Sequence, residues 1–294
     1  MEVIIYIYYS NNKRIKKDTY YKVILKKKIG EGSYGYIYEI NDTTVVKIFK
    51  NYTYLDKVET KNNIIPHKNE NRELHFFINY IKNNILTSSH IIEIHGIGLI
   101  KSTTFNKIKF ENHYCLFLPY CVPISKLLHQ YKMPFIKLNY GKILTMHFMK
   151  RLIEIELYLN KEFKITNLDI KLDNCMIEKG KQLKIDNIIG IDLGLIKKKN
   201  QEKYYFKTHY FIWPYKKEVK LDYIPSYSIC INGLILLFGK NENVQIKDIN
   251  QHLNELKGDK ELYHIFYNGL LLKIKSKDLY ILINNYIKKY EHKK

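Results

Sequence analysis

The alternation of apolar and polar positions divides the chain into a strand-rich first third and a mostly helical remainder. Early on, apolar residues alternate with polar ones or form short β-branched runs that end at Gly, Asn or Pro, which is typical of strands. Later, apolar residues recur every three or four positions, which is typical of amphipathic helices. The predicted strands are 1–9, 20–29, 36–40, 44–49, 91–100, 113–118, 175–178 and 183–191. The predicted helices are 70–83, 137–160, 226–238, 246–256, 260–273 and 276–290.

Strands that precede helices, rather than alternate with them, predict an α+β fold with separate β-rich and helical parts. Pro119 and Pro123 interrupt the pattern near the point where its character changes. We therefore expect two lobes: a small β-rich N-lobe with one helix over residues 1–120, and a helical C-lobe over 121–294.

Composition supports a folded chain and leaves its partners open. The 294 residues are 46% hydrophobic, which is enough to bury a sizeable core. We therefore do not expect a globally disordered chain. The formal charge of +20 could attract nucleic acid, an acidic protein or an anionic nucleotide. It comes almost wholly from Lys, with three Arg and no Ala, as expected for a very AT-rich genome. Since Arg makes the bidentate contacts to nucleic acid, a Lys-based charge indicates nucleic acid less strongly.

The cysteines and the apolar segments indicate where the chain resides. Four cysteines without C-x-x-C spacing are expected to be free thiols in a reducing compartment. The apolar N-terminus lacks a basic region before it, so it predicts a strand rather than a signal peptide. The apolar run 229–238 is too short to span a bilayer. We expect a cytoplasmic protein with no membrane association.

A glycine-rich turn lies between two predicted strands. The segment Gly30-Glu31-Gly32-Ser33-Tyr34-Gly35, followed by Tyr36-Ile37, has the spacing G-x-G-x-x-G-x-V with Ile for Val. Glycines allow the backbone to approach phosphates and to point N–H groups at them. Because a strand pattern follows, a β-hairpin over a nucleotide is favoured over a dinucleotide site, which needs a helix there.

A lysine stands inside the strand 44–49, flanked by Val46 and Ile48. As a functional residue Lys47 would bind the α and β phosphates, and it would need a carboxylate to hold it. Glu73 is the preferred partner, at the rim of the apolar face of the helix 70–83, and Glu70 is the alternative. Both acids could also be ordinary solvated helix residues.

A second polar set follows the long helix. Asp169, Lys171 and Asn174 stand between two apolar runs, and Asp192 ends the apolar run 188–191 in the order Asp-Leu-Gly. The ordered set, with the glycine-rich turn, Lys47 and Glu73, resembles the eukaryotic-type protein kinases over residues 20 to 240. The resemblance implies a bilobal kinase-like fold that binds ATP and Mg²⁺.

The resemblance also assigns roles. It implies that Asp169 is the catalytic base, that Lys171 contacts the γ-phosphate, and that Asn174 and Asp192 ligate Mg²⁺. The implied ATP-binding residues are Ile29, Gly30, Glu31, Gly32, Ser33, Tyr34, Gly35, Ile37, Val45, Lys47, Glu73, Leu118 and Met176. Thr208, in a segment similar to T-x-x-Y-x-A-P-E, and Lys171 favour Ser/Thr side chains of proteins as the phosphate acceptors.

The chain departs from the family pattern in its scaffold. Asn167 and Leu168 replace the His-Arg pair before the base, so we expect no need for an activation-loop phosphate. Tyr215 replaces the Glu of A-P-E, and the buried Arg that this Glu pairs with is missing as well. Ser228 stands where the next buried helix usually carries an Asp. The residues that handle ATP, metal and proton are all present, which favours an active enzyme.

Other readings remain open. A pseudokinase that scaffolds or inhibits other proteins would retain ATP binding without transfer. A nucleic-acid-binding protein would use the basic surface, and a small-molecule kinase could share the fold. The compact size, divergent scaffold and AT-rich composition resemble the Ser/Thr kinases of large DNA viruses, poxviruses especially, which implies action on viral or host proteins in the host cytoplasm.

Overall fold

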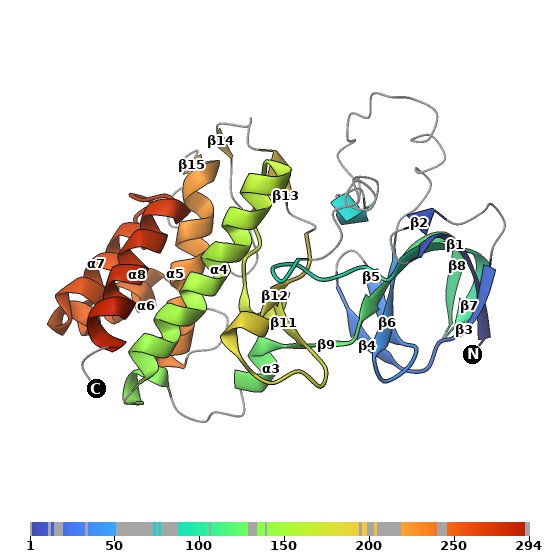
Figure 1. Ribbon diagram of the computed structural model, residues 1–294, viewed down its shortest axis with the longest axis horizontal. Coiled ribbons are helices and arrows are strands. Elements are labelled where there is room, and N and C mark those ends of the chain that lie inside the picture. The colour runs from blue at the N-terminus through green and yellow to red at the C-terminus, as the bar shows by residue number, and fades with distance from the viewer. Residues whose placement is uncertain are drawn as a thin grey trace. The chain divides into compact units, whose positions relative to one another are not determined.

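The structure is a computed structural model of the 294-residue chain (Figure 1). It describes residues 2–10, 13–14, 20–32, 35–50, 73–74, 76–77, 88–105, 107–128, 134–138, 140–193, 196–198, 203–204, 219–239 and 246–291. The chain forms two compact units. Unit 1 comprises residues 1–88, 92–121 and 178–181, and unit 2 comprises 89–91, 122–177 and 182–294.

Unit 1 is built on one antiparallel sheet that closes on itself. The sheet order is β2-β1-β7-β8-β6-β5-β4, and β3 pairs with β1. β3 and β4 are two parts of one stretch of chain, because Lys26 and Lys27 between them also hydrogen-bond to Glu39 of β5. The N-terminal strand therefore closes the sheet into a barrel and leaves no long unpaired edge there. The strands are β1 (Glu2–Ser10), β2 (Lys13–Arg14), β3 (Tyr20–Ile24), β4 (Lys28–Glu31), β5 (Gly35–Glu39), β6 (Thr44–Phe49), β7 (Gly96–Phe105) and β8 (Ile108–Pro119).

Alternate residues of these strands fill the barrel. Val3 and Ile5 of β1, Tyr38 of β5, Val46 of β6 and Phe110 of β8 belong to one buried cluster. Because successive side chains on a strand point to opposite faces, the residues between them point out of the barrel. On β6 these are Val45 and Lys47.

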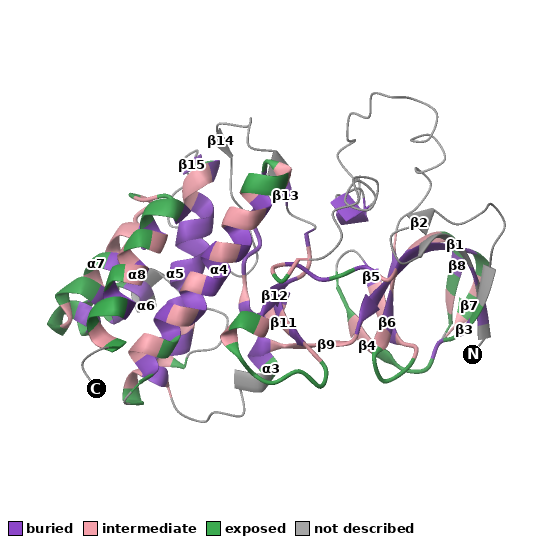
Figure 2. Ribbon diagram, in the orientation of Figure 1, coloured by how far each residue is buried: buried purple, intermediate pink, exposed green. Residues whose placement is uncertain are grey.

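Unit 2 is mostly helical (Figure 1). Its helices are α3 (Ile124–Leu128), α4 (Gly141–Phe163), α5 (Ile224–Phe238), α6 (Ile246–Glu255), α7 (Lys260–Leu270) and α8 (Ser276–Glu291). Together with the strands of unit 1, they confirm the predicted α+β class. Figure 2 shows α5 buried along nearly its whole length, whereas α7 and α8 each keep an exposed face. A helix that is apolar on all sides must be enclosed by others, and α5 is the central helix of the unit.

A glycine lets α5 approach its neighbours closely. A side chain at Gly233 would bring its Cβ within 2.4 Å of the sulfur of Met149 on α4 and 2.9 Å of the Phe266 ring on α7. Real Cβ atoms do not come this close, so the helix contact depends on the missing side chain. Gly233 therefore fixes α5 against both helices at the level of the residue before it, Asn232.

Short elements connect the helices of unit 2 and surround the candidate site. Two small sheets, β12-β11-β9 and β10-β13, include three strands of the segment 165–192. The strands are β9 (Cys121–Pro123), β10 (Ile165–Asn167), β11 (Cys175–Glu178), β12 (Ile189–Gly190), β13 (Ile196–Lys198), β14 (Lys203–Tyr204) and β15 (Val219–Lys220). The 3₁₀ turns are η1 (Phe135–Lys137), η2 (Leu172–Asn174), η3 (Ile185–Asn187), η4 (Leu221–Tyr223) and η5 (Leu256–Gly258).

Two of the predicted strands are partly wrong. The run 91–100 is a strand only from Gly96, because residues 92–95 bury their isoleucines in irregular backbone, and an apolar run alone cannot distinguish the two. In 183–191 only Ile189 and Gly190 pair as a strand. The residues before them comprise η3 and Ile188, and the carbonyls of Asp186 and Ile188 accept hydrogen bonds from an arginine of α4.

The apolar segment of α5 is longer than the sequence pattern indicates. With η4 it forms an 18-residue helical stretch, Leu221–Phe238, of mean hydropathy 1.4, which by length and composition alone could cross a membrane. However, 83% of this stretch is buried inside the protein, as in the core helix of a globular domain. The four cysteines are free, as expected.

Candidate functional site

In unit 1 the glycine-rich segment joins β4 to β5 as a hairpin, as the sequence predicts. Gly30 pairs with Ile37 and Glu31 pairs with Tyr36, and the N–H of Gly32 donates to the carbonyl of Gly35 at 3.0 Å. A Cβ at Gly35 would lie 2.7 Å from the carbonyl oxygen of Ile48, so this glycine is required by the neighbouring strand. Apart from its chain neighbours, no atom of the described residues lies within 4 Å of a Cβ built at Gly32, so these residues leave its backbone open to a ligand.

The strand register gathers four of the predicted nucleotide-binding residues of unit 1 on one face of the barrel wall. Lys47 is paired with Ile37 of β5, and Val45 is paired with Leu118 of β8. Directly paired residues of antiparallel strands point to the same side of the sheet, and Val45 and Lys47 lie two apart on β6. The four side chains therefore share the outer face, with three apolar residues around one amine.

Lys47 forms an ion pair with Glu73, the carboxylate that the sequence favoured. Glu73 lies in helical backbone beside the buried residues Leu74, Phe76 and Phe77. The side chains of Lys47 and Glu73 are only 12% and 4% exposed. Charges removed from water to this extent need a partner, so each residue holds the other in place.

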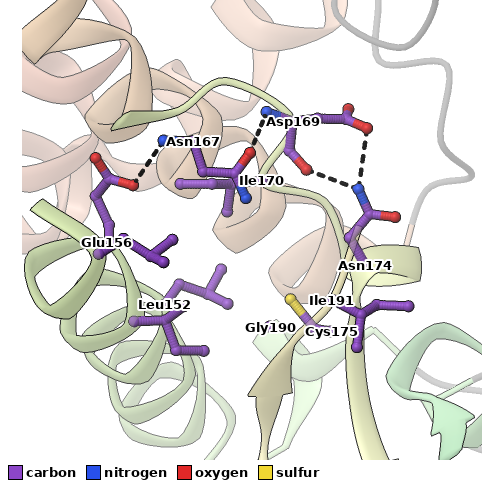
Figure 3. Close-up of a pocket in the computed structure, with 11 residues that line it drawn as sticks. Leu152, Glu156, Asn167, Asp169, Ile170, Asn174, Cys175, Gly190 and Ile191 are labelled. Carbon is purple, nitrogen blue, oxygen red and sulfur yellow. Dashed lines mark hydrogen bonds between the residues drawn. The ribbon is translucent and has the colours of Figure 1, made fainter. Parts of the chain in front are cut away.

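In unit 2 the segment after α4 converges on the carboxylate of Asp169 (Figure 3). The Nζ of Lys171 donates to its Oδ2 at 2.9 Å, and the Nδ2 of Asn174 donates to the same oxygen at 2.9 Å. The Nδ2 of Asn174 also donates to the Asp169 main-chain carbonyl at 2.8 Å. Within the described part of the chain, the hydrogen bonds to this carboxylate end on Oδ2, which leaves Oδ1 to accept a proton from elsewhere.

Asn167, which replaces the expected His, forms the turn that aims Asp169. Its Oδ1 accepts a hydrogen bond from the N–H of Asp169, two residues later, at 3.0 Å. This is the hydrogen bond of an Asx turn. Its own N–H donates to Oε2 of Glu156, a buried residue of α4, at 3.1 Å. The side chain of Leu168, in the place of the usual Arg, is buried in the core of unit 2. A buried leucine cannot bind a phosphate, and the expectation that no activation-loop phosphate is needed stays a prediction.

Asp192 is connected to the same segment through the backbone. The N–H of Ile191, just before it, donates to the carbonyl of Asn174 at 2.8 Å, and Met176 pairs with Ile189. Asp192 has φ +58°, in the left-handed region that few residues other than glycine adopt and that Asp and Asn tolerate best. Unusual backbone of this kind is concentrated at functional sites.

Arg151 of α4 fixes the turn that leads to Asp192. Its Nε donates to the carbonyl of Ile188 at 2.9 Å, and its Nη2 donates to the carbonyls of Asp186, at 3.0 Å, and Ser89. The side chain is 5% exposed. One planar guanidinium thus satisfies three carbonyls that have no strand partner, which Lys could not do.

We call residues 167–174 the Asp169 segment. A small cavity of about 20 Å³ lies beside it (Figure 3). Leu152, Glu156 and Cys175 line it together with Asn167 and Asp169. It has room for about one water molecule. It is too small for a nucleotide.

Asn174 and Asp192 are suited to Mg²⁺. Magnesium prefers oxygen ligands and is commonly held by one or two protein side chains together with substrate phosphates. Both hydrogen bonds from Nδ2 of Asn174 go to Asp169, which turns its Oδ1 away from that residue. Among the described residues no three His, Cys, Asp or Glu side chains gather, so a cage made of such side chains alone is absent from that part of the chain. The donor set fits a metal that completes its shell with phosphate and water.

Several predicted residues lie outside the described part of the chain: Ser33, Tyr34, Glu70 and the segment from Thr208 to Tyr215. Conversely, sequence reasoning missed Glu156, Arg151 and Asn232, which support the Asp169 segment and the turn before Asp192. The available signal was a polar residue within an otherwise apolar helix face. Asn232, for example, stands inside the apolar run 229–238.

No protein-family model matches the sequence, and no curated protein matches it. The fold is nevertheless similar to that of a solved structure described as the ROP18 kinase domain in complex with AMP-PNP and sucrose. The TM-score is 0.63 at 11% sequence identity, over 100% of this chain and 88% of that one. At this identity the likeness concerns the fold alone. The chain has a protein-kinase-like fold, as the sequence motifs predict.

Proposed function

We propose that this protein transfers the γ-phosphoryl group of ATP to serine or threonine hydroxyls of proteins. The observation that carries the proposal is the polar set on Asp169. Lys171 and Asn174 both donate to its Oδ2, while Oδ1 accepts nothing from the described residues. A general base needs a carboxylate that is held in one orientation and keeps one oxygen for the proton, and this arrangement supports both.

Phosphoryl transfer requires positioning and charge neutralisation more than covalent chemistry. Asp169 orients the acceptor hydroxyl and takes its proton at Oδ1. The ammonium of Lys171 neutralises charge on the transferring group while it holds the carboxylate of Asp169. Asn174 and Asp192 would hold Mg²⁺, which would supply positive charge to the phosphate oxygens.

The residues of unit 1 bind the nucleotide. The hairpin of the glycine-rich segment presents backbone N–H groups to the phosphates, with Gly32 open to approach. Lys47, held by Glu73, binds phosphate oxygens. Ile37, Val45 and Leu118, on the same face as Lys47, offer an apolar surface for the adenine ring.

The proposal is tested by incubating the purified protein with γ-labelled ATP, Mg²⁺ and either casein or histone as a generic substrate. We expect label in the substrate, and phosphoamino-acid analysis should find it on serine and threonine. Label on tyrosine alone would overturn the acceptor class. Absence of label from both substrates and from the protein itself would overturn the transferase activity.

A second candidate is a nucleotide-binding scaffold without transfer, and the replacement of the family's scaffold residues favours it. Leu168 is buried where the pattern has Arg, and the Oγ of Ser228 makes no hydrogen bond to the described residues where the pattern has Asp. This candidate is distinguished by thermal stabilisation with ATP and Mg²⁺ in a protein that transfers no phosphate. Transfer that depends on Asp169 would exclude it.

A further inference from the structure

Asn232 is a buried amide in the middle of the central helix. It lies on α5 between Ile231 and Gly233 and is 1% exposed. Burying an amide costs free energy unless its donors and acceptor are all paired. Its hydrogen bonds therefore show what it contributes.

Both ends of the Asn232 amide are used, and two of the three bonds reach the Asp169 segment. Its Oδ1 accepts from the N–H of Leu172 at 3.0 Å, and its Nδ2 donates to the carbonyl of Ile170 at 2.9 Å. Ile170 and Leu172 flank Lys171 on either side. The third bond, from Nδ2 to the carbonyl of Ser228 at 2.7 Å, ties the amide to its own helix. The amide thus fastens the backbone around Lys171 to α5.

This attachment depends on the amide group itself. A carboxylate at position 232 could still accept from Leu172, but it has no hydrogen to donate and would face the carbonyl oxygens of Ile170 and Ser228. An apolar side chain would leave an N–H and a carbonyl of the Asp169 segment buried and unpaired. Neither residue could replace Asn at this position without loosening the segment.

Ser228 offers a matched comparison one turn earlier on the same helix. It is fully buried, yet its Oγ makes no hydrogen bond to any described residue. Of these two buried polar residues of α5, Asn232 is the one whose side chain holds the Asp169 segment.

We propose that Asn232 is a positioning residue for phosphoryl transfer, which fixes Asp169 and Lys171 by holding the backbone at Ile170 and Leu172. The inference rests on the proposed function for its kinetic consequence, but the attachment itself does not. Misplacing a reacting group by about 1 Å can cost on the order of 100-fold in rate. Among the described residues, the hydrogen bonds of the Asn232 side chain go to Ile170, Leu172 and Ser228, all of unit 2, so its loss should affect turnover and spare ATP affinity.

The test compares Asn232→Leu and Asn232→Asp with the control Ser228→Ala in the full chain. Turnover and KM for ATP are measured, together with hydrogen–deuterium exchange at the Leu172 amide. We expect kcat to fall on the order of 100-fold in Asn232→Leu with KM for ATP within about twofold. The Leu172 amide should exchange on the order of 10-fold faster, and Ser228→Ala should change neither quantity.

The two kinds of failure are separable. Unchanged exchange at Leu172 in the folded Asn232 variants overturns the attachment, whatever the activity. Equal effects of Ser228→Ala on kcat also overturn it, since that variant removes no hydrogen bond. If the wild-type protein transfers no phosphate, the proposed function fails, and the exchange measurement alone decides whether Asn232 holds the segment. Asn232→Asp keeps the size of the side chain, so it provides the comparison should Asn232→Leu not fold.

Discussion

Lys47 and Glu73 form an ion pair whose side chains are almost completely withdrawn from water. Removal of one partner leaves the other charge buried and unpaired, which typically costs about 3–5 kcal/mol. Removal of both costs much less when the replacements are apolar. The pair therefore links the stability of unit 1 to the position of the amine proposed to bind phosphate.

We expect Glu73→Ala to lower the free energy of unfolding by about 3 kcal/mol, and Lys47→Met with Glu73→Leu to cost clearly less than the sum of the single changes. Denaturant unfolding of the wild type, Lys47→Met, Glu73→Leu and the double variant measures the coupling, and Glu73→Ala is measured beside them. The exposed pair Lys109–Glu111 on β8 is the control, and breaking it should have no measurable effect. A cost as small for Lys47 as for Lys109 would show that the pair is solvated.

Asp192 is expected to make nucleotide binding depend on Mg²⁺. Its replacement by Asn retains a residue that tolerates φ +58°, so the fold should persist while the negative charge is lost. ATP with Mg²⁺ should raise the melting temperature of the wild-type protein, and EDTA or Asp192→Asn should remove most of that increase. Asp186→Asn, an exposed residue on η3, is the control. An unchanged ATP effect in EDTA would contradict the assignment of the metal ligands.

Arg151 is expected to be irreplaceable by Lys. A lysine ammonium also has three N–H donors, but they lie on one nitrogen and cannot take the separate positions of Nε and Nη2, from which Arg151 reaches the carbonyls of Ser89, Asp186 and Ile188. Buried carbonyls would therefore be left unpaired. We expect Arg151→Lys to lower the free energy of unfolding by about 3 kcal/mol, and Lys150→Met, on the next residue of α4, to change it by no more than about 0.5 kcal/mol. Similar costs for the two variants would mean that the three hydrogen bonds do not hold the turn.

Asp259 is expected to make the stability of unit 2 depend on pH in the acid range. Burial raises the pKa of this carboxyl, but hydrogen bonds from Tyr286, the N–H of Leu262 and Lys142 lower it by more, and the net pKa lies below its ordinary value. A carboxyl with a lowered pKa stabilises the fold above the pKa of the unfolded chain, near pH 4, and that contribution is lost as the pH falls through the folded pKa.

Asp259→Asn should therefore be less stable than the wild type at pH 7, and the difference should shrink as the pH falls below about 4. Denaturant unfolding from pH 7 to pH 2 measures it. A difference that is constant over this range would show that the charge of Asp259 contributes nothing.

Much of the site could be predicted because its chemistry is local in sequence. Asp169, Lys171 and Asn174 lie within six residues, so their spacing alone indicated one polar cluster, and the structure joins them through Oδ2 of Asp169. Strand 44–49 was predicted with its observed bounds because a β-branched run between turns has few alternatives. The likeness to a solved kinase domain confirms the fold that these motifs indicated.

The parts that sequence could not predict depend on contacts between distant residues. The closure of the barrel by β1 needs pairing of residues 2–10 with both β3 and β7, and no local pattern specifies such partners. The same holds for Asn232 and Leu172, which are 60 residues apart, and for Arg151 and Ile188. Ser228 shows the converse, since the side chain at the position that the family pattern marks makes no hydrogen bond to the described residues, whereas that of Asn232 does.

The most direct measurement is transfer of the labelled γ-phosphate of ATP to the purified protein itself, in the wild type and in Asp169→Asn, with Mg²⁺ present. Asp186→Asn serves as the control for a charge change elsewhere in unit 2, and matched thermal unfolding verifies that all three are folded. We expect label to accumulate in the wild type and in Asp186→Asn, and to be lost in Asp169→Asn. Equal labelling of the wild type and Asp169→Asn, or no labelling of a wild-type protein that binds ATP, would contradict the assignment of Asp169 as the base of a phosphotransferase.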